Sequence, residues 1–203
     1  MNSSKLKLAI LTPLVGLSLG ACVDLDDFSD QDGASGNYGD QFAEGERLEL
    51  VAHSAIPTQS DQMPTSGTAQ YQGIAQFGDN KGEIQHPEGP AFNSKMTLTA
   101  DFGNDTVGGR LYDFETNKRM GSSGISGELA ITDGTIQSNA GNAGFSANVG
   151  GTLSADGDTF TFSGTADGGF GNNADVLSGE MVLTDDGEGG DQPTYVEFAT
   201  ERQ

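Results

Sequence analysis

From residue 68 to residue 198 the chain alternates apolar and polar residues in run after run, with a period of two. The first run places five small or apolar side chains on one face: Ala69, Tyr71, Gly73, Ala75 and Phe77. Successive side chains of a strand point to opposite faces, so this alternation predicts half-buried strands. Hairpin-type signals such as Asp133-Gly134 and Asp156-Gly157-Asp158 separate the runs, and no segment shows a sustained helical period. We therefore expect an all-β domain of about eight antiparallel strands in chain order, closed as an up-and-down barrel or split into a sandwich.

Glycines on the apolar face favour the barrel. Six runs carry one in mid-strand, with apolar neighbours two residues before and after: Gly73, Gly109, Gly127, Gly151, Gly164 and Gly179. Glycine inside a strand costs about 0.5–1 kcal/mol relative to alanine, and chance is the alternative explanation in a chain with 31 glycines. Strands that coil tightly around a narrow core need small residues at the bends. An eight-stranded barrel has just enough interior for side chains to fill it, and the inward Phe, Leu and Met predict a filled one.

The first 21 residues have the features of a secretory signal. Lys5 and Lys7 precede a short apolar run, residues 8–19, that ends in small residues. The sequence Leu19-Gly20-Ala21-Cys22 resembles the bacterial lipobox, which implies cleavage before Cys22 and lipid on its thiol and amino group. The alternative is an ordinary signal peptide that happens to precede a cysteine. Cys22 is the single cysteine, so an internal disulfide is excluded.

The chain divides into four parts. Residues 1–21 are the expected lipoprotein signal peptide, residues 22–66 a disordered acidic low-complexity tether, residues 67–199 the β-barrel domain and residues 200–203 a tail. Within the tether, the short apolar stretch Leu48–Ala52 fits a first strand or a helical turn. Val23 favours sorting to the outer membrane by analogy, which leaves the periplasmic or cell-surface face undetermined.

Charge limits the partners. The whole chain has 30 acidic residues and 9 Lys and Arg, a net charge of −21. Removal of Lys5 and Lys7 with the leader gives 30 − 7, a net charge of −23 for the mature chain. Such a surface repels nucleic acid and anionic lipid headgroups. It suits a protein held off a membrane, a cation binder or a protein from a salty habitat.

Several runs together resemble the β-barrel domain of transferrin-binding protein B-like lipoproteins. The opening strand of that domain is similar to Gly67–Gly73, and its second hairpin to Leu98–Phe102 with Gly108–Leu111. Ile125–Leu129 resembles the next strand, and residues 162–179 the glycine-rich closing hairpin. The resemblance covers roughly residues 67–183. It implies an outer-membrane lipoprotein with an eight-stranded barrel, of a kind that takes part in binding host iron carriers or haem.

Two departures from the family pattern put transferrin itself in doubt as the ligand. The chain has room for one barrel and lacks a substantial handle domain. Its closing hairpin has Gly169–Asn173 where an aromatic pair and a proline are more usual. The ligand contacts of the family lie in variable loops, so no binding residue is carried over.

Chemically reactive residues are few. His86, in an irregular loop, is the best single candidate for a haem or metal ligand, and Tyr71, Tyr112 and Met120 are residue types that join such a site. A solvated loop histidine is the simpler interpretation, and His53 borders the tether. The acidic clusters at residues 24–32 and 185–191 lack the spacing of a calcium loop. No catalytic motif is found, so we expect no enzyme and no resident cofactor.

Two functions remain open at this point. The first is a lipid-anchored binding module that presents loops to a protein partner or to haem. The second is a structural envelope lipoprotein with no soluble ligand. In both, the membrane is contacted through the lipid on Cys22.

Overall fold

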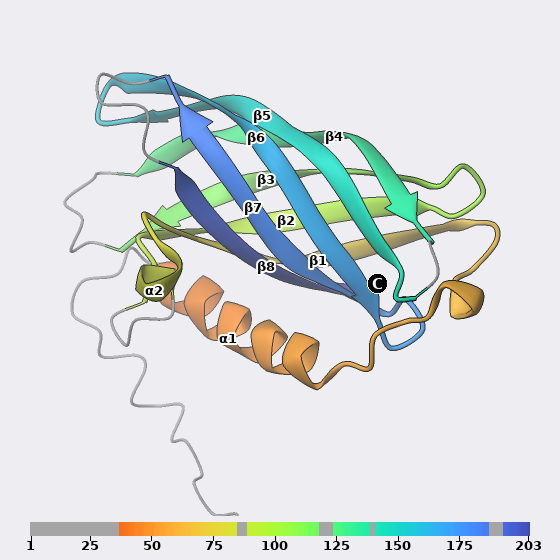
Figure 1. The fold of residues 1–203 in the computed structure, drawn as a ribbon. Coiled ribbons are helices and arrows are strands. Elements are labelled where there is room, and N and C mark those ends of the chain that lie inside the picture. Colours follow the sequence, from red (N-terminus) through yellow and green to blue (C-terminus); the bar gives the residue numbers. More distant parts are fainter. Residues whose placement is uncertain (1–36, 85–88, 118–123, 139–140, 187–192) are drawn as a thin grey trace, which may run out of the picture.

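Eight antiparallel strands, each paired with its neighbours in chain order, close on themselves in the computed structural model (Figure 1). The structure describes residues 37–84, 89–117, 124–138, 141–186 and 193–203. The strands are β1 (Thr68–Gly78), β2 (Phe92–Asp101), β3 (Thr106–Thr116), β4 (Ile125–Gln137), β5 (Gly144–Ala155), β6 (Asp158–Gly171), β7 (Val176–Asp185) and β8 (Thr194–Arg202). Pairing of β1 with β8 completes the ring, so the barrel is confirmed over the sandwich. The last strand extends to Arg202, into the expected tail.

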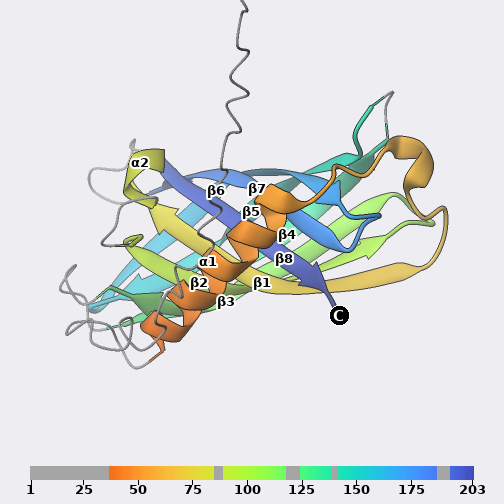
Figure 2. The ribbon, with the colours of Figure 1, turned by 90° about the horizontal axis from the view of Figure 1, so that it is seen from below.

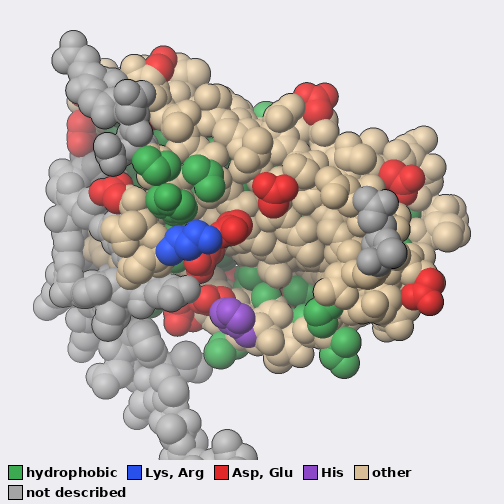
Figure 3. Space-filling view, in the orientation of Figure 1, with side chains coloured by type: hydrophobic (Ala, Val, Ile, Leu, Met, Phe, Trp, Pro, Cys, Tyr) green, Lys and Arg blue, Asp and Glu red, His purple; other side chains and the backbone are tan. Residues whose placement is uncertain are grey.

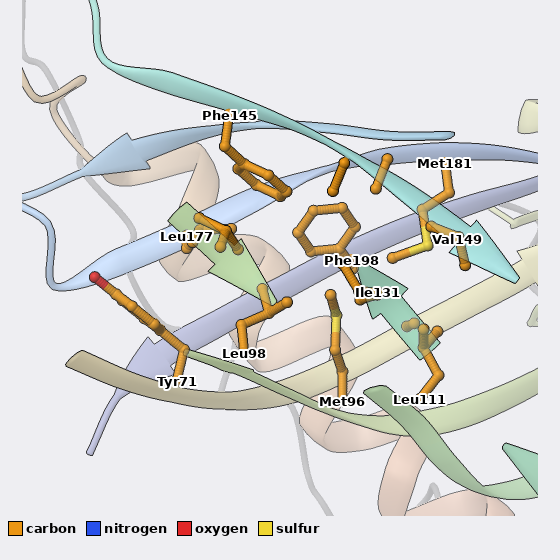
Figure 4. Close-up of a cluster of buried hydrophobic side chains, with 14 of the residues drawn as sticks. Tyr71, Met96, Leu98, Leu111, Ile131, Phe145, Val149, Leu177, Met181 and Phe198 are labelled. Atoms are coloured by element: carbon orange, nitrogen blue, oxygen red, sulfur yellow. The ribbon is translucent and has the colours of Figure 1, made fainter. Parts of the chain in front are cut away.

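Side chains from all eight strands fill the barrel. Large residues such as Tyr71, Leu111 and Leu183 are fully buried there, and Figure 4 shows ten labelled side chains converging from different strands. The core holds aliphatic, aromatic and methionine side chains. The prediction of a filled interior is therefore confirmed.

Each of the six mid-strand glycines lies directly against the backbone of a neighbouring strand. A Cβ atom added at any of them would lie between 2.0 Å (Gly73, Gly164) and 2.3 Å (Gly151) from a backbone oxygen of the next strand. Real Cβ atoms do not come so close, so alanine there would push the two strands apart. The tight coil of the barrel is thus the cause of the pattern.

One expected hairpin turn is part of a strand instead. Asp133-Gly134 lies inside β4, where the register with β5 shifts between Thr132 and Thr135. Asp133 has a left-handed φ of 54°. A β-bulge uses the same left-handed backbone as a tight turn, so the two share a sequence signal.

A helix covers part of the outside of the barrel. The sequence predicts a tether over residues 22–66, whereas α1 (Tyr38–Ser54) lies across the outer face of β1 and β8 (Figure 2). Its buried side chains are Tyr38, Gln41, Gly45 and Leu48. Two of these four residues, Gln41 and Gly45, carry no apolar side chain. The sequence of α1 therefore shows no helical period of apolar residues. Residues 22–36 lie outside the described part of the chain, and the tether there stays a prediction.

The segment after α1 closes one end of the barrel. We call residues 55–63, which include the short helix η2 (Ser60–Gln62), the sealing segment. Thr58 at its centre is buried; its N–H donates to the Phe170 oxygen at 2.8 Å and its oxygen accepts from the Ala143 N–H at 2.8 Å. Its hydroxyl accepts from the Ala174 N–H at 3.0 Å. The backbone is thereby tied to the connections β4–β5 and β6–β7.

A short helix, α2 (Lys81–Ile84), follows β1 at the opposite end. Among the described residues, no helix combines the length and apolar character needed to cross a bilayer.

Candidate functional site

The end of the barrel opposite the sealing segment carries an apolar recess. We call it the open-end recess; its volume is about 240 Å³. It lies where β1, β3, β5 and β7 end and β2, β4, β6 and β8 begin. The lining residues are Gly78, Asp79, Ala91, Phe92, Ile125, Leu153, Ala155, Phe160, Phe162, Asp185 and Thr194. The connections 79–91, 117–124 and 186–193 join strands at this end.

Alternation along the strands places apolar side chains at this end. Phe160 and Phe162 are two residues apart near the start of β6, so both point inward. Phe92, Ile125 and Phe160 pack against the core but are only partly buried, because the strands end before another layer covers them. The recess is therefore apolar and reaches solvent.

An aromatic cluster stiffens the wall of the recess. The Phe77 and Phe92 rings are stacked with centroids 4.3 Å apart, and Phe114 lies edge-on to Phe77 at 5.8 Å. Phe77 is fully buried. Stacked rings in a packed core have little freedom to move, so the recess is largely preformed.

Acidic residues border the recess. Asp79 and Asp185 line it, and none of the described lining residues is a Lys or Arg. The neighbouring Asp186 accepts from the Thr161 N–H at 2.7 Å, and this backbone hydrogen bond lowers the pKa of its carboxyl group. The described part of the recess thus offers apolar contact beside acidic side chains.

Most of the residues predicted as ligands are not brought together. Cys22, His86 and Met120 lie outside the described residues, as does the acidic cluster 24–32. His53 lies on α1, 74% exposed, with Nδ1 3.9 Å from the Glu49 carboxylate. His53 lies in the last turn of α1, at the end of the helix opposite Tyr38.

The two tyrosines occupy different places. Tyr71 is inside the barrel, where its hydroxyl donates to the Ala174 oxygen at 2.7 Å, and burial raises its pKa to about 12. Tyr112 lies on the outside, with the Arg110 guanidinium 4.9 Å from its ring centroid. The two rings therefore cannot share one haem. Within the described ranges, no group of three or more His, Cys, Asp or Glu side chains is arranged to hold a metal ion.

The recess itself was not expected from the sequence. Phe92, Phe160 and Phe162 are indistinguishable there from core residues, because all of them obey the same alternation. The one sequence signal for the recess is position, because these aromatic residues lie at strand ends next to long connections.

A filled eight-stranded up-and-down barrel, closed at one end and recessed at the other, defines a small all-β domain that offers a surface site. Residues 63–202 match the model of the family described as C-lobe and N-lobe beta barrels of Tf-binding protein B. Because that match covers more than half of the chain, this protein belongs to the family of transferrin-binding protein B-like β-barrels. The resemblance seen in the sequence is confirmed, and the family is one of binding proteins.

Comparisons with other proteins add the following. No curated protein matches the chain. A similar solved structure is titled "The Structure of Intact Ap-TbpB (N and C lobes)", with 21% identity and a TM-score of 0.42. The alignment covers 72% of this chain and 28% of that one, so the present chain spans less than a third of that protein's length.

Proposed function

We propose that this protein is a lipid-anchored lipoprotein of the outer membrane whose barrel binds a protein partner at the open-end recess. Membership of a family of binding proteins supports the binding role. The lipobox-like sequence at Cys22 supports the anchor. The observation that carries the proposal is the difference between the two ends: one sealed by residues 55–63, the other ending in partly exposed Phe92, Ile125 and Phe160.

The size of the recess favours a protein partner over a small molecule. Pockets for drug-sized ligands usually measure about 300–1,000 Å³, and this one measures about 240 Å³. That volume suits one apolar side chain from a partner, which is the usual form of an interface anchor. The acidic border favours basic residues around that anchor.

A photocrosslinking experiment in cells tests the site. Benzoylphenylalanine replaces Phe160, a partly buried aromatic of the recess, and irradiation should join the protein to one partner. The same amino acid in place of Leu50, which is 72% exposed on α1, is the control and should give no such adduct.

A second change separates the recess from general proximity. Ile125→Glu places a charge in the recess and should abolish the adduct formed through residue 160 while the barrel stays folded by circular dichroism. Equal adducts from positions 160 and 50, or no adduct from either, would contradict binding at the recess. The second outcome would favour a structural envelope role.

The anchor and the haem ligand have their own tests. Cys22→Ser should release the protein from membranes and abolish palmitate labelling; a protein that still sediments with membranes would overturn the anchor.

Haem bound through His86 stays a prediction of the sequence. It requires a Soret shift on haem addition that His86→Ala removes, and a titration without any shift would eliminate it.

A further inference from the structure

Three acidic residues form a row across the outside of the barrel, away from the recess. Asp167 of β6 is the direct partner of Glu180 of β7, and Glu180 is the direct partner of Glu197 of β8. Neighbouring strands lie about 4.8 Å apart, and like charges directly opposite each other destabilise a sheet. Neutral polar residues at these three positions would avoid this destabilisation of the sheet.

A hollow lies beside this row. The adjacent cross-strand row consists of Gly169, Ser178 and Ala199, whose small side chains leave the sheet surface low. Glu49 and His53 of α1 form the opposite wall, and the enclosed volume is about 500 Å³. We call this the acidic hollow. Figure 3 shows acidic side chains gathered around it and a histidine at its edge.

The charges in the acidic hollow are not balanced from within. Burial, and then Glu46 and Glu197, raise the pKa of the Glu49 carboxyl group. Lys81 of α2 forms an ion pair with Glu180 at one edge, and no other Lys or Arg of the described residues forms an ion pair with the row. Its ammonium group demonstrates that a cation fits against these carboxylates.

A buried amide provides a second and independent indication of a ligand. Gln76 of β1 is the direct partner of Glu197 and lines the hollow. Its side chain is 4% exposed, yet its Nε2 has no hydrogen-bond partner among the described residues. A buried donor left unpaired costs about 1–3 kcal/mol. An acceptor brought by a ligand would remove that cost.

We propose that the acidic hollow binds a basic peptide segment of a partner protein, with Arg or Lys side chains against Glu197 and Asp167 and a backbone carbonyl toward Gln76. A peptide is the class of ligand that fits, because the acidic row requires a cation and the Gln76 Nε2 requires a hydrogen-bond acceptor. A metal ion or an oligoamine supplies positive charge but no acceptor for Nε2. The hollow is separate from the open-end recess, so this inference goes beyond the function proposed above.

The test uses a labelled seven-residue peptide with two arginines among alanines and glycines, added to the purified protein in 150 mM NaCl. Amide chemical shifts in ¹⁵N-labelled protein should change chiefly at Gly168, Gly169, Ser178 and Gly179, which form the floor of the hollow. Shifts spread evenly over the acidic surface would overturn the proposal.

Variants matched in charge separate the hollow from the general negative field. Glu180→Gln with Glu197→Gln should weaken the peptide at least tenfold by fluorescence anisotropy. Asp61→Asn with Asp105→Asn removes the same charge from exposed positions elsewhere and should change affinity less than twofold. Equal losses from both pairs would show that surface charge alone holds the peptide, and would overturn the proposal.

Two neutral changes test the shape and the amide. Ser178→Trp fills the hollow without altering charge and should weaken the peptide about tenfold. Gln76→Met should weaken it severalfold without lowering the melting temperature, since it removes an unpaired buried donor. If Gln76→Met lowers stability and leaves affinity intact, Gln76 is structural and the proposed carbonyl contact is overturned. Ile125→Glu in the open-end recess should leave peptide affinity unchanged, so the two proposals fail separately.

Discussion

Gly108 and Gly109 are neighbours in β3, and their side-chain positions face opposite sides of the barrel wall. A Cβ on Gly109 would lie 2.1 Å from the Thr97 oxygen, whereas a Cβ on Gly108 would meet its nearest atom, the Ile131 oxygen, at 3.5 Å. The first is an impossible contact between strands, and the second is ordinary van der Waals contact. Adjacent glycines thus have different reasons to be glycine.

We expect Gly109→Ala to lower the free energy of unfolding by about 2–3 kcal/mol, because strands β2 and β3 must separate to admit the methyl group. Gly108→Ala should be neutral or stabilise by up to about 1 kcal/mol, since alanine loses less backbone entropy on folding. Urea denaturation of the two variants measures the difference. Equal effects would disprove the account of the inward glycines.

Tyr71 links stability to alkaline pH. Its pKa is about 12 in the folded protein, raised from 10.0 chiefly by burial. Above pH 10 the unfolded chain loses this proton while the folded one keeps it, so the stability contribution is complete below pH 10 and is lost as pH rises through 12. Tyr71→Phe should therefore flatten the fall in the free energy of unfolding between pH 10 and 12. Urea titrations at pH 8, 10 and 11 would reveal it.

At neutral pH the same variant should cost about 1–2 kcal/mol, because the buried Ala174 oxygen loses its 2.7 Å hydrogen bond. A variant as stable as the parent at pH 8 would contradict this.

At the level of single residues, sequence reasoning separated inside from outside well. The period of two identified Tyr71 and the inward glycines as core positions. It could not identify the acidic row, because Asp167, Glu180 and Glu197 are far apart in the chain and become neighbours only through strand register. The candidate ligands His86 and Met120 rest on residue type and, for His86, on its irregular loop, and both lie outside the described residues.

Helix α1 is joined to the barrel by a small apolar contact. Leu48 is 1% exposed and packs with Ile74 and Ala199, while the partly buried Ala52 lies against them. Tyr38 and Gln41 hold the start of the helix through hydrogen bonds to the Pro90 and Asp113 oxygens, so this cluster is the apolar anchor of its second half. Attachment of this second half is therefore sensitive to a single side chain, that of Leu48.

We expect Leu48→Ala to release the second half of α1 while the barrel remains folded, since the side chain anchors a cluster separate from the main core. Trypsin cleavage at Arg47, which lies in the helix, should accelerate about tenfold or more, with little change in the melting of the barrel. Leu50→Ala is the matched control, because that leucine is 72% exposed. Identical cleavage rates in the two variants would show that α1 is held by other contacts.

The strands were predictable as elements and the helix was not. Strands β1 to β8 alternate because one side of each meets a core and the other meets water. Helix α1 buries Tyr38, Gln41 and Gly45 beside a single leucine, so its sequence lacks the apolar stripe by which amphipathic helices are found. Asp133-Gly134 predicts a turn and forms a bulge, because both structures use left-handed backbone.

The molecule as a whole carries strong negative charge, and we expect salt to stabilise it. Raising NaCl from 10 mM to 500 mM shortens the screening length from about 30 Å to under 5 Å, which relieves repulsion across rows such as that of Glu180 and Glu197. The melting temperature should rise by about 3–6 °C, corresponding to 1–2 kcal/mol. Calorimetry measures it.

Magnesium chloride at equal ionic strength is the control for this experiment. An equal rise in both salts indicates screening. A much larger rise in magnesium would instead reveal a specific cation site, which the described residues do not form.

At the scale of the molecule, the closed barrel and its filled core followed from the number of strands and the inward glycines. The asymmetry of the two barrel ends did not follow, because the Pro, Ser and Gln content of the sealing segment predicts a tether. Thr58 reaches across the barrel end only once β5, β6 and β7 are in place. Such a contact has no local sequence signal.

The two chain ends of the described structure leave the barrel at opposite poles. Near the start, the Tyr38 hydroxyl donates to the Pro90 oxygen beside the open end, whereas the Gln203 N–H donates to the Gln70 oxygen near the sealed end. A fluorescent protein fused after Gln203 would therefore emerge at the sealed pole and leave the recess clear. A fluorescent protein inserted just before residue 37 would instead lie beside the recess and shield it. The site of fusion therefore decides whether the reporter images the protein or blocks its recess.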